Sequence, residues 1–211
     1  MTLPARPIKF YRFALSGHSH RVELFLALLR LPFEPIDVDL LGGEHKRPEF
    51  LALNAFGQVP VIDDGGTVVA DSCAILIYLA LRYAPPSWLP RDPAGAAQVQ
   101  RWLSAASGPL AYGPNLARVV QLFKRPVDPR EYIDRSHALL NVVENTLADA
   151  RAFIVGSEPT IADLALYAYT ARAPEGNVSL ADYAAVRGWL RRVESLPGFV
   201  PMPASPIGLA A

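Results

Sequence analysis

The chain has 211 residues, of which 51% are hydrophobic, so it is long and apolar enough to bury a core in one large domain or two small ones. Its 20 basic side chains balance 20 acidic ones without blocks of like charge, which argues against nucleic acid or an anionic membrane as a partner. A single cysteine, Cys73, excludes an internal disulfide, and the chain has neither a leader-like start nor an apolar run of roughly 18 residues, so we expect a cytoplasmic protein.

The first 83 residues alternate between strand and helix signals. Between Ser19 and Pro32, apolar residues recur at the i, i+3, i+4 and i+7 spacing of a helix with one buried face. This helix joins two strands, as the crossover of a parallel βαβ unit does. A charged helical segment, a hairpin and a second apolar helix follow, so the predicted order is βαβαββα. The predicted strands lie at 8–13, 33–38, 61–62 and 67–70, and the later helices at 44–53 and 74–83.

From residue 84 the composition changes. The stretch APPSWLPRDPAG has four prolines in twelve residues, which is typical of a linker. Only helical signals follow it, including GSEPTIADLALY, where Thr160 and Asp163 have the spacing of a capping box. We therefore expect one domain over residues 1–83, a linker over 84–94 and an all-α domain over 95–211.

Two motifs carry a resemblance to a known family. The segment GQVPVIDDGGTVVADSCAILIYLA at 57–80 resembles the glutathione-binding segment of the cytosolic glutathione transferases, and the helix-opening TIAD at 160–163 resembles a motif in their helical half. The resemblance covers almost the whole chain. It implies an α/β plus all-α protein, in which a thioredoxin-like βαβαββα domain precedes an α-helical bundle domain.

Pro60 lies between two valines at the start of a predicted strand. Because proline donates no backbone hydrogen bond, it is tolerated at a strand's first residue, and an ordinary trans proline would suffice there. The resemblance instead implies a cis proline, with the backbone of Val59 pairing with the cysteine of glutathione as an added strand would.

The resemblance also implies sites for the ends of glutathione, which has an amine and two carboxylates. Asp71 would accept from the ammonium, while Ser72 and the start of the helix that follows would hold the γ-glutamyl carboxylate. His45, Lys46 and Gln58 would hold the glycine carboxylate. From the residues alone, Ser72 could simply cap its helix and Lys46 could lie on a solvated face.

Catalysis in this family depends on forming the thiolate of glutathione. Lowering a thiol pKa from about 8.5 by roughly two units requires about 2.7 kcal/mol, which a charge-assisted hydrogen bond and a helix N-terminus can supply. The donor should follow the first strand, in FALSGHSHRVEL, where Ser16 is our first candidate and His18 and Ser19 are the others. Ser19 could instead cap the helix. Tyr11 and Cys73 are interpreted as core residues.

The expected function is a glutathione S-transferase acting on a small hydrophobic electrophile, with Tyr112, Asn115 and Arg118 in the pocket wall. Two alternatives remain: another glutathione-dependent reaction, such as peroxide or disulfide reduction or isomerisation, and a non-catalytic glutathione-binding module. The family resemblance further implies a homodimer. The four histidines and one cysteine show no metal-binding spacing, so we expect no metal.

Overall fold

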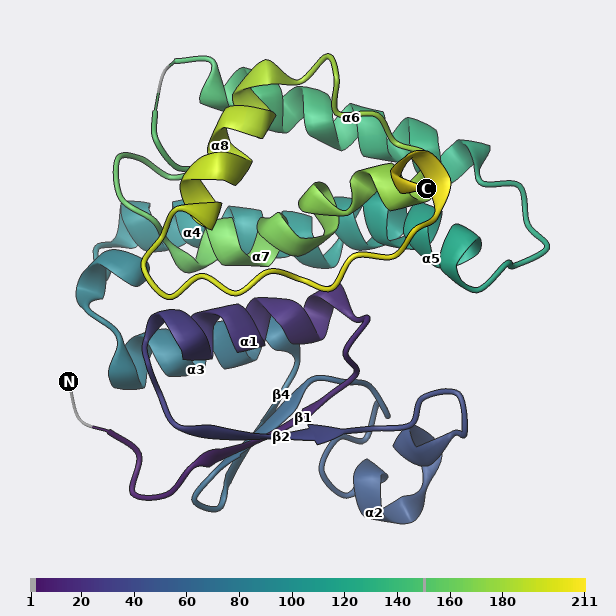
Figure 1. The fold of residues 1–211 in the computed structure, drawn as a ribbon. Coiled ribbons are helices and arrows are strands. Elements are labelled where there is room, and N and C mark those ends of the chain that lie inside the picture. Colours follow the sequence, from purple (N-terminus) through teal and green to yellow (C-terminus); the bar gives the residue numbers. More distant parts are fainter. Residues whose placement is uncertain (1–2, 150) are drawn as a thin grey trace.

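The computed structural model describes residues 3–149 and 151–211, which fold into an N-terminal α/β part and a C-terminal helical part (Figure 1). The first part is built on a mixed four-stranded sheet in the order β2-β1-β3-β4. The central strand β1 runs parallel to β2 and antiparallel to β3, and β3 pairs antiparallel with β4 across the hairpin. The strands are β1 (Ile8–Arg12), β2 (Phe33–Asp37), β3 (Val61–Asp64) and β4 (Thr67–Ala70).

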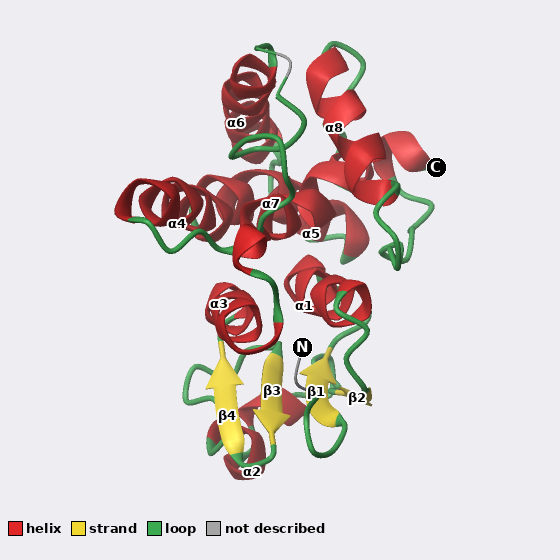
Figure 2. Ribbon diagram, turned by 90° about the vertical axis from the view of Figure 1, so that its left-hand side faces the viewer, coloured by secondary structure: helices red, strands yellow, loops and turns green. Residues whose placement is uncertain are grey.

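Helices cover both faces of this sheet. Strand alternation places Ile8 and Phe10 on one face, against α1 (Gly17–Leu28) and α3 (Ser72–Tyr83). On the other face Val61 packs against Phe50 of the short helix α2 (Pro48–Leu51). Figure 2 shows the result as layers, with the sheet below, α1 and α3 above it, and the helical part above those two helices.

The C-terminal part is all-helical, as predicted. Its central helix α7 (Ile161–Ala171) is buried along nearly its whole length and packs against α1, α3 and α4 (Pro93–Ser107). The predicted capping box is confirmed: Thr160 caps α7, and the Asp163 carboxylate accepts from the backbone N–H of Thr160 at 2.9 Å. The helices are α4 (Pro93–Ser107), α5 (Leu116–Leu122), α6 (Arg130–Leu147), α7 (Ile161–Ala171) and α8 (Ala184–Glu194), with short helical turns η1 (Glu44–Lys46), η2 (Pro86–Trp88), η3 (Ala111–Asn115), η4 (Ala173–Gly176) and η5 (Gly208–Ala210).

The last residues cross the junction between the two parts. In Figure 1 this segment, drawn in yellow, runs between α1 and α7 before ending near α5. The Val200 carbonyl accepts from His20 of α1 at 2.9 Å, and the Ser205 amide donates to Glu175 of η4 at 3.0 Å. The tail therefore bonds to both parts of the chain. Within the described ranges, no helix combines the length and apolarity needed to cross a bilayer.

Candidate active site

A cavity of about 820 Å³ lies where the two parts of the chain meet. Every predicted site residue except Ser19 and Tyr112 contributes to its lining. The lining residues from the N-terminal part are Ser16, His18, His45, Lys46, Gln58, Val59, Pro60, Asp71 and Ser72, and those from the helical part include Asn115, Arg118, Phe123 and Tyr169. Residues far apart in sequence thus converge on one site.

Ser16 is the N-cap of α1 and faces this cavity. Its backbone is extended, and its Oγ accepts from the backbone N–H of Ser19 at 3.2 Å. This capping bond uses the Ser16 oxygen as acceptor and not its O–H, which can be donated into the cavity, where Tyr169 also lies within hydrogen-bonding reach of Ser16. The positive end of the α1 dipole lies at the same place, so an anion next to Ser16 is doubly favoured.

Ser19 lies inside α1 and not in the predicted loop, so its predicted place at the site is wrong. The predicted loop ended at Ser19, but α1 already begins at Gly17, and this earlier start turns Ser19 into the interior. Its side chain is 1% exposed, and its Oγ accepts from the Phe13 amide at 3.2 Å. Ser19 therefore stabilises the loop before α1 and does not face the cavity.

His18 lines the cavity and contacts the ring of Tyr169 edge-on, with 5.0 Å between ring centroids. Burial and then the charge of Arg21 lower the pKa of His18 to about 3. The imidazole is therefore neutral near pH 7, so it can act there as a neutral donor but not as a cation. Gly17 permits the close approach of Tyr169, since a Cβ there would lie 2.7 Å from the tyrosine ring.

The Val59–Pro60 peptide bond is cis, and Pro60 directly precedes β3. Two side chains hold the loop in front of it. Asn54 donates to the Gln58 carbonyl at 2.8 Å, and Lys46 Nζ donates to the carbonyls of Phe56 and Gly57 at 3.2 and 3.1 Å. Lys46 thus bonds to the loop, and an ammonium with three N–H groups keeps one for a ligand.

The start of α3 places two polar side chains at the cavity. Asp71, and not Ser72, caps this helix: its Oδ1 accepts from the amides of Cys73 and Ala74 at 2.8 and 3.0 Å. Asp71 has a positive φ of 73°, a conformation that costs a non-glycine residue about 1–3 kcal/mol and is often found at functional sites. Because Asp71 makes the cap, the hydroxyl of Ser72 is available to a ligand.

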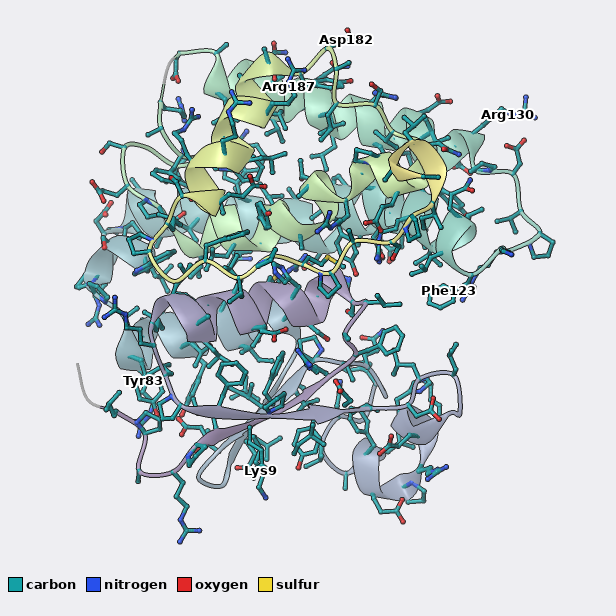
Figure 3. The ribbon with its side chains drawn as sticks, viewed as in Figure 1. Lys9, Tyr83, Phe123, Arg130, Asp182 and Arg187 are labelled. Atoms are coloured by element: carbon teal, nitrogen blue, oxygen red, sulfur yellow. The ribbon has the colours of Figure 1, made fainter. Side chains whose placement is uncertain are left out.

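The helical wall follows the prediction only in part. Asn115 and Arg118 line the cavity, and Phe123 points from the end of α5 toward the N-terminal part (Figure 3). Tyr112 instead lines a second cavity of about 550 Å³ between α4 and α6, and is 58% exposed. The prediction assumed a straight α-helix, whereas η3 is a π-helical turn whose wider spacing rotates Tyr112 away.

Arg118 is a buried member of the wall. Its guanidinium pairs with the buried carboxylate of Glu175 at 2.6 Å and donates to the Leu15 carbonyl at 2.8 Å. Since Leu15 directly precedes Ser16, this bond ties the helical part to the loop that presents the candidate catalytic hydroxyl. Across residues 3–149 and 151–211, His, Cys, Asp and Glu side chains form no group of three or more suited to a metal ion.

The sequence analysis did not identify Tyr169, which lines the cavity, or Arg21, which lies behind Ser72. Tyr169 belongs to α7, and no local sequence pattern distinguishes it from the other buried residues of that helix. The position of Arg21 could have been predicted from the sequence, because it precedes Leu24 and Phe25 by three and four residues and so shares the buried face of α1. A basic residue on an apolar helical face indicates a buried charge with a specific partner.

Comparisons with known proteins agree with this architecture. The family models for the glutathione S-transferase N-terminal and C-terminal domains match residues 15–82 and 127–197. Glutathione S-transferase 3 of Zea mays is 35% identical over 220 residues, covering 95% of this chain and 97% of its own. A glutathione S-transferase structure from Pseudomonas fluorescens has a TM-score of 0.87 and 35% identity, covering 93% of this chain and 99% of its own. A glutathione transferase homolog from Drosophila mojavensis, solved with bound glutathione, has a TM-score of 0.80 and 30% identity, covering 90% of this chain and 89% of its own.

Proposed function

This chain belongs to the glutathione S-transferase family and is a transferase, and we propose that Ser16 activates the glutathione thiol for attack on a small hydrophobic electrophile. One observation carries the assignment to Ser16. Its Oγ lines the cavity and accepts the α1 capping bond from Ser19, so the cap does not use its hydrogen, which can be donated to a ligand in the cavity beside Tyr169.

The proposed pose of glutathione follows the polar groups of the cavity. The backbone of Val59 pairs with the cysteinyl residue, and the Ser72 hydroxyl with the α3 N-terminus receives the γ-glutamyl carboxylate. Asp71 uses one carboxylate oxygen for its cap and offers the other to the ammonium. His45, Lys46 and Gln58, which line the same cavity, would hold the glycine carboxylate.

The electrophile would bind against the helical wall. Val119, Leu122 and Phe123 of this wall, with Phe13 and Leu15 from the loop before α1, give the cavity an apolar lining beside the polar groups of Asn115, Arg118 and Arg125. An apolar wall next to a thiolate favours an uncharged, hydrophobic electrophile. The neutral His18 can donate an N–H to the thiolate or to the leaving group, in the role of an assisting donor.

We also propose a homodimer and a cytoplasmic location, both expected from the family. The dimer is supported by the second cavity between α4 and α6, where Tyr112 of η3 and Val142 of α6 are exposed apolar side chains. Light scattering tests this directly: a monomeric mass at micromolar protein concentration would remove the dimer from the proposal.

The decisive experiment is an ultraviolet difference titration that follows thiolate absorbance of bound glutathione against pH. We expect the wild type to lower the thiol pKa well below about 8.5, and Ser16→Ala to raise it by about one to two units, since a hydrogen bond to a charged group contributes roughly 1.5–3 kcal/mol. Ser16→Thr keeps the hydroxyl and should retain the low value.

Loss of a helix cap is controlled by Asp92→Ala, because Asp92 caps α4 through the Gly95 amide outside the cavity. This variant should leave the thiol pKa unchanged. An unshifted pKa in Ser16→Ala would transfer the role to His18, and a wild type that binds no glutathione would refute the proposed function.

A further inference from the structure

Arg21 is a fully buried arginine without a carboxylate partner in the described part of the chain. It lies in α1 and is 1% exposed. No acidic side chain lies within salt-bridge distance of it, whereas the other fully buried arginine, Arg118, pairs with Glu175 at 2.6 Å. Its Nε and Nη2 have no hydrogen-bond partner among residues 3–149 and 151–211. A guanidinium stays charged in a protein, so this charge is uncompensated.

Arg21 contacts the cavity wall through Ser72, which lines the cavity. Its Nη1 donates to Ser72 Oγ at 3.2 Å and lies 3.5 Å from Cys73 Sγ. Both partners belong to the first turn of α3, where the helix dipole is already positive. A cation at this end of a helix is unfavourable by itself, and burial without a partner adds a further cost. Both costs fall when an anion binds at Ser72.

We propose that Arg21 is a positioning residue for glutathione, which orients the Ser72 hydroxyl and supplies the buried positive charge that attracts the γ-glutamyl α-carboxylate. Ser72 Oγ accepts from Arg21, so its own O–H is left to donate toward the cavity that it lines. Arg21 itself is absent from the cavity lining and acts through Ser72. This inference rests on the proposed function.

The field of Arg21 reaches other groups of the cavity wall. Its charge contributes to the lowered pKa of His18, where burial has the larger effect. It also lowers the pKa of Tyr169, although burial outweighs it and raises that pKa overall. In both cases the charge favours the less positive form of a cavity-lining group, so its potential extends into the space that a ligand would occupy.

The test compares two ligands that differ only in the carboxylate concerned. Calorimetric titration with glutathione is set against titration with 4-aminobutyryl-cysteinylglycine, which keeps the amine and the thiol but lacks the γ-glutamyl α-carboxylate. We expect Arg21→Met to weaken glutathione binding by about 10- to 100-fold and binding of the analogue by less than about threefold. Arg30→Met, which removes an exposed charge just after the same helix, should affect neither ligand.

Equal weakening of both ligands would assign Arg21 a purely structural role and overturn the inference, as would unchanged binding of both. A wild type that binds neither ligand would refute the proposed function itself, and is recognised before any variant is made. Arg21→Gln keeps a donor near Ser72 without the charge and gives the same comparison if Arg21→Met does not fold.

A double-mutant cycle tests the route through Ser72. If Arg21 acts through this hydroxyl, the pair Arg21→Met and Ser72→Ala should weaken glutathione binding by clearly less than the product of the two single effects. Fully multiplicative effects would show that Arg21 and Ser72 act independently, and would overturn the proposed positioning.

Discussion

His20 should make the fold sensitive to mild acid, and replacing it should remove part of that sensitivity. Its ring is 2% exposed, and because Val200 offers only a carbonyl oxygen, Nε2 must donate to it. Nδ1 is buried without a partner among the described residues. Protonation would place an unsatisfied N–H at Nδ1, near the positive charges of Arg172 and Arg21. Burial first, and then these charges, lower the pKa of His20 to about 4, although the bond to Val200 opposes them.

The size and sign of the effect follow from linkage. The folded pKa of about 4 lies below the ordinary histidine value of 6.5, so the unfolded chain binds the proton more readily. The stability contributed by neutral His20 is fully present above pH 6.5 and is lost as the pH falls toward 4. Each pH unit in this window costs up to about 1.4 kcal/mol, which gives about 2 kcal/mol between pH 7.5 and pH 5.

Urea unfolding at pH 7.5 and pH 5, at one protein concentration, measures this loss. Between these two conditions, the free energy of unfolding should fall by about 2 kcal/mol more in the wild type than in His20→Gln, which keeps a donor but does not titrate. Arg30→Gln, an exposed charge change after the same helix, should show the wild-type pH dependence. If His20→Gln lost stability between the two pH values as steeply as the wild type, the assigned pKa of His20 would be wrong.

Three further predictions concern buried polar groups. Asp163→Ala should lower the free energy of unfolding by more than about 3 kcal/mol, because three buried donors lose their acceptor: the amides of Ile154 and Thr160 and the indole N–H of Trp189. A urea unfolding curve close to that of the wild type would contradict this prediction. Glu175→Gln should cost about 3–5 kcal/mol by leaving Arg118 unpaired, and adding Arg118→Met should restore much of it in the same assay. Because the pKa of His18 is about 3, the pH profile of kcat/KM between pH 5.5 and 8 should have the same shape in His18→Asn as in the wild type. If the wild-type profile has an inflection in this range that the variant lacks, His18 titrates there and the prediction is wrong.

The sequence predicted the N-terminal fold well because its signals are local. The helix ending before Pro32, the hairpin around Gly65 and the capping box at Thr160 are each set by residues close together in the chain. The candidate residues around Val59 and Ser72 lie in a short motif that carries the family resemblance, and both line the cavity. These local patterns specify the strands and helix starts on which most of the cavity is built.

The sequence failed where a side chain's direction depends on distant packing. Ser19 was predicted to face the cavity because the predicted start of α1 was three residues too late. Tyr112 was predicted to line the same cavity because the spacing of apolar residues does not reveal a π-helical turn. Glu175 and Tyr169 join the site through contacts with residues more than 50 positions earlier in the chain. Such contacts follow from the docking of the two parts, which no local pattern encodes.

Ser16 and Ser72 have the same arrangement of hydrogen bonds at the two anionic groups of the proposed ligand, the thiolate and the γ-glutamyl carboxylate. Each serine is at the start of a helix, and each hydroxyl accepts one hydrogen bond from inside the protein, from the Ser19 amide or from Arg21. Each is thereby left to donate its only hydrogen to the cavity, next to a positive helix end. The distance between the two donors is fixed by the packing of α1 on α3, which also buries Arg21. Because Arg21 links α1 to the first turn of α3, a change that loosens this packing should weaken carboxylate binding and thiol activation together.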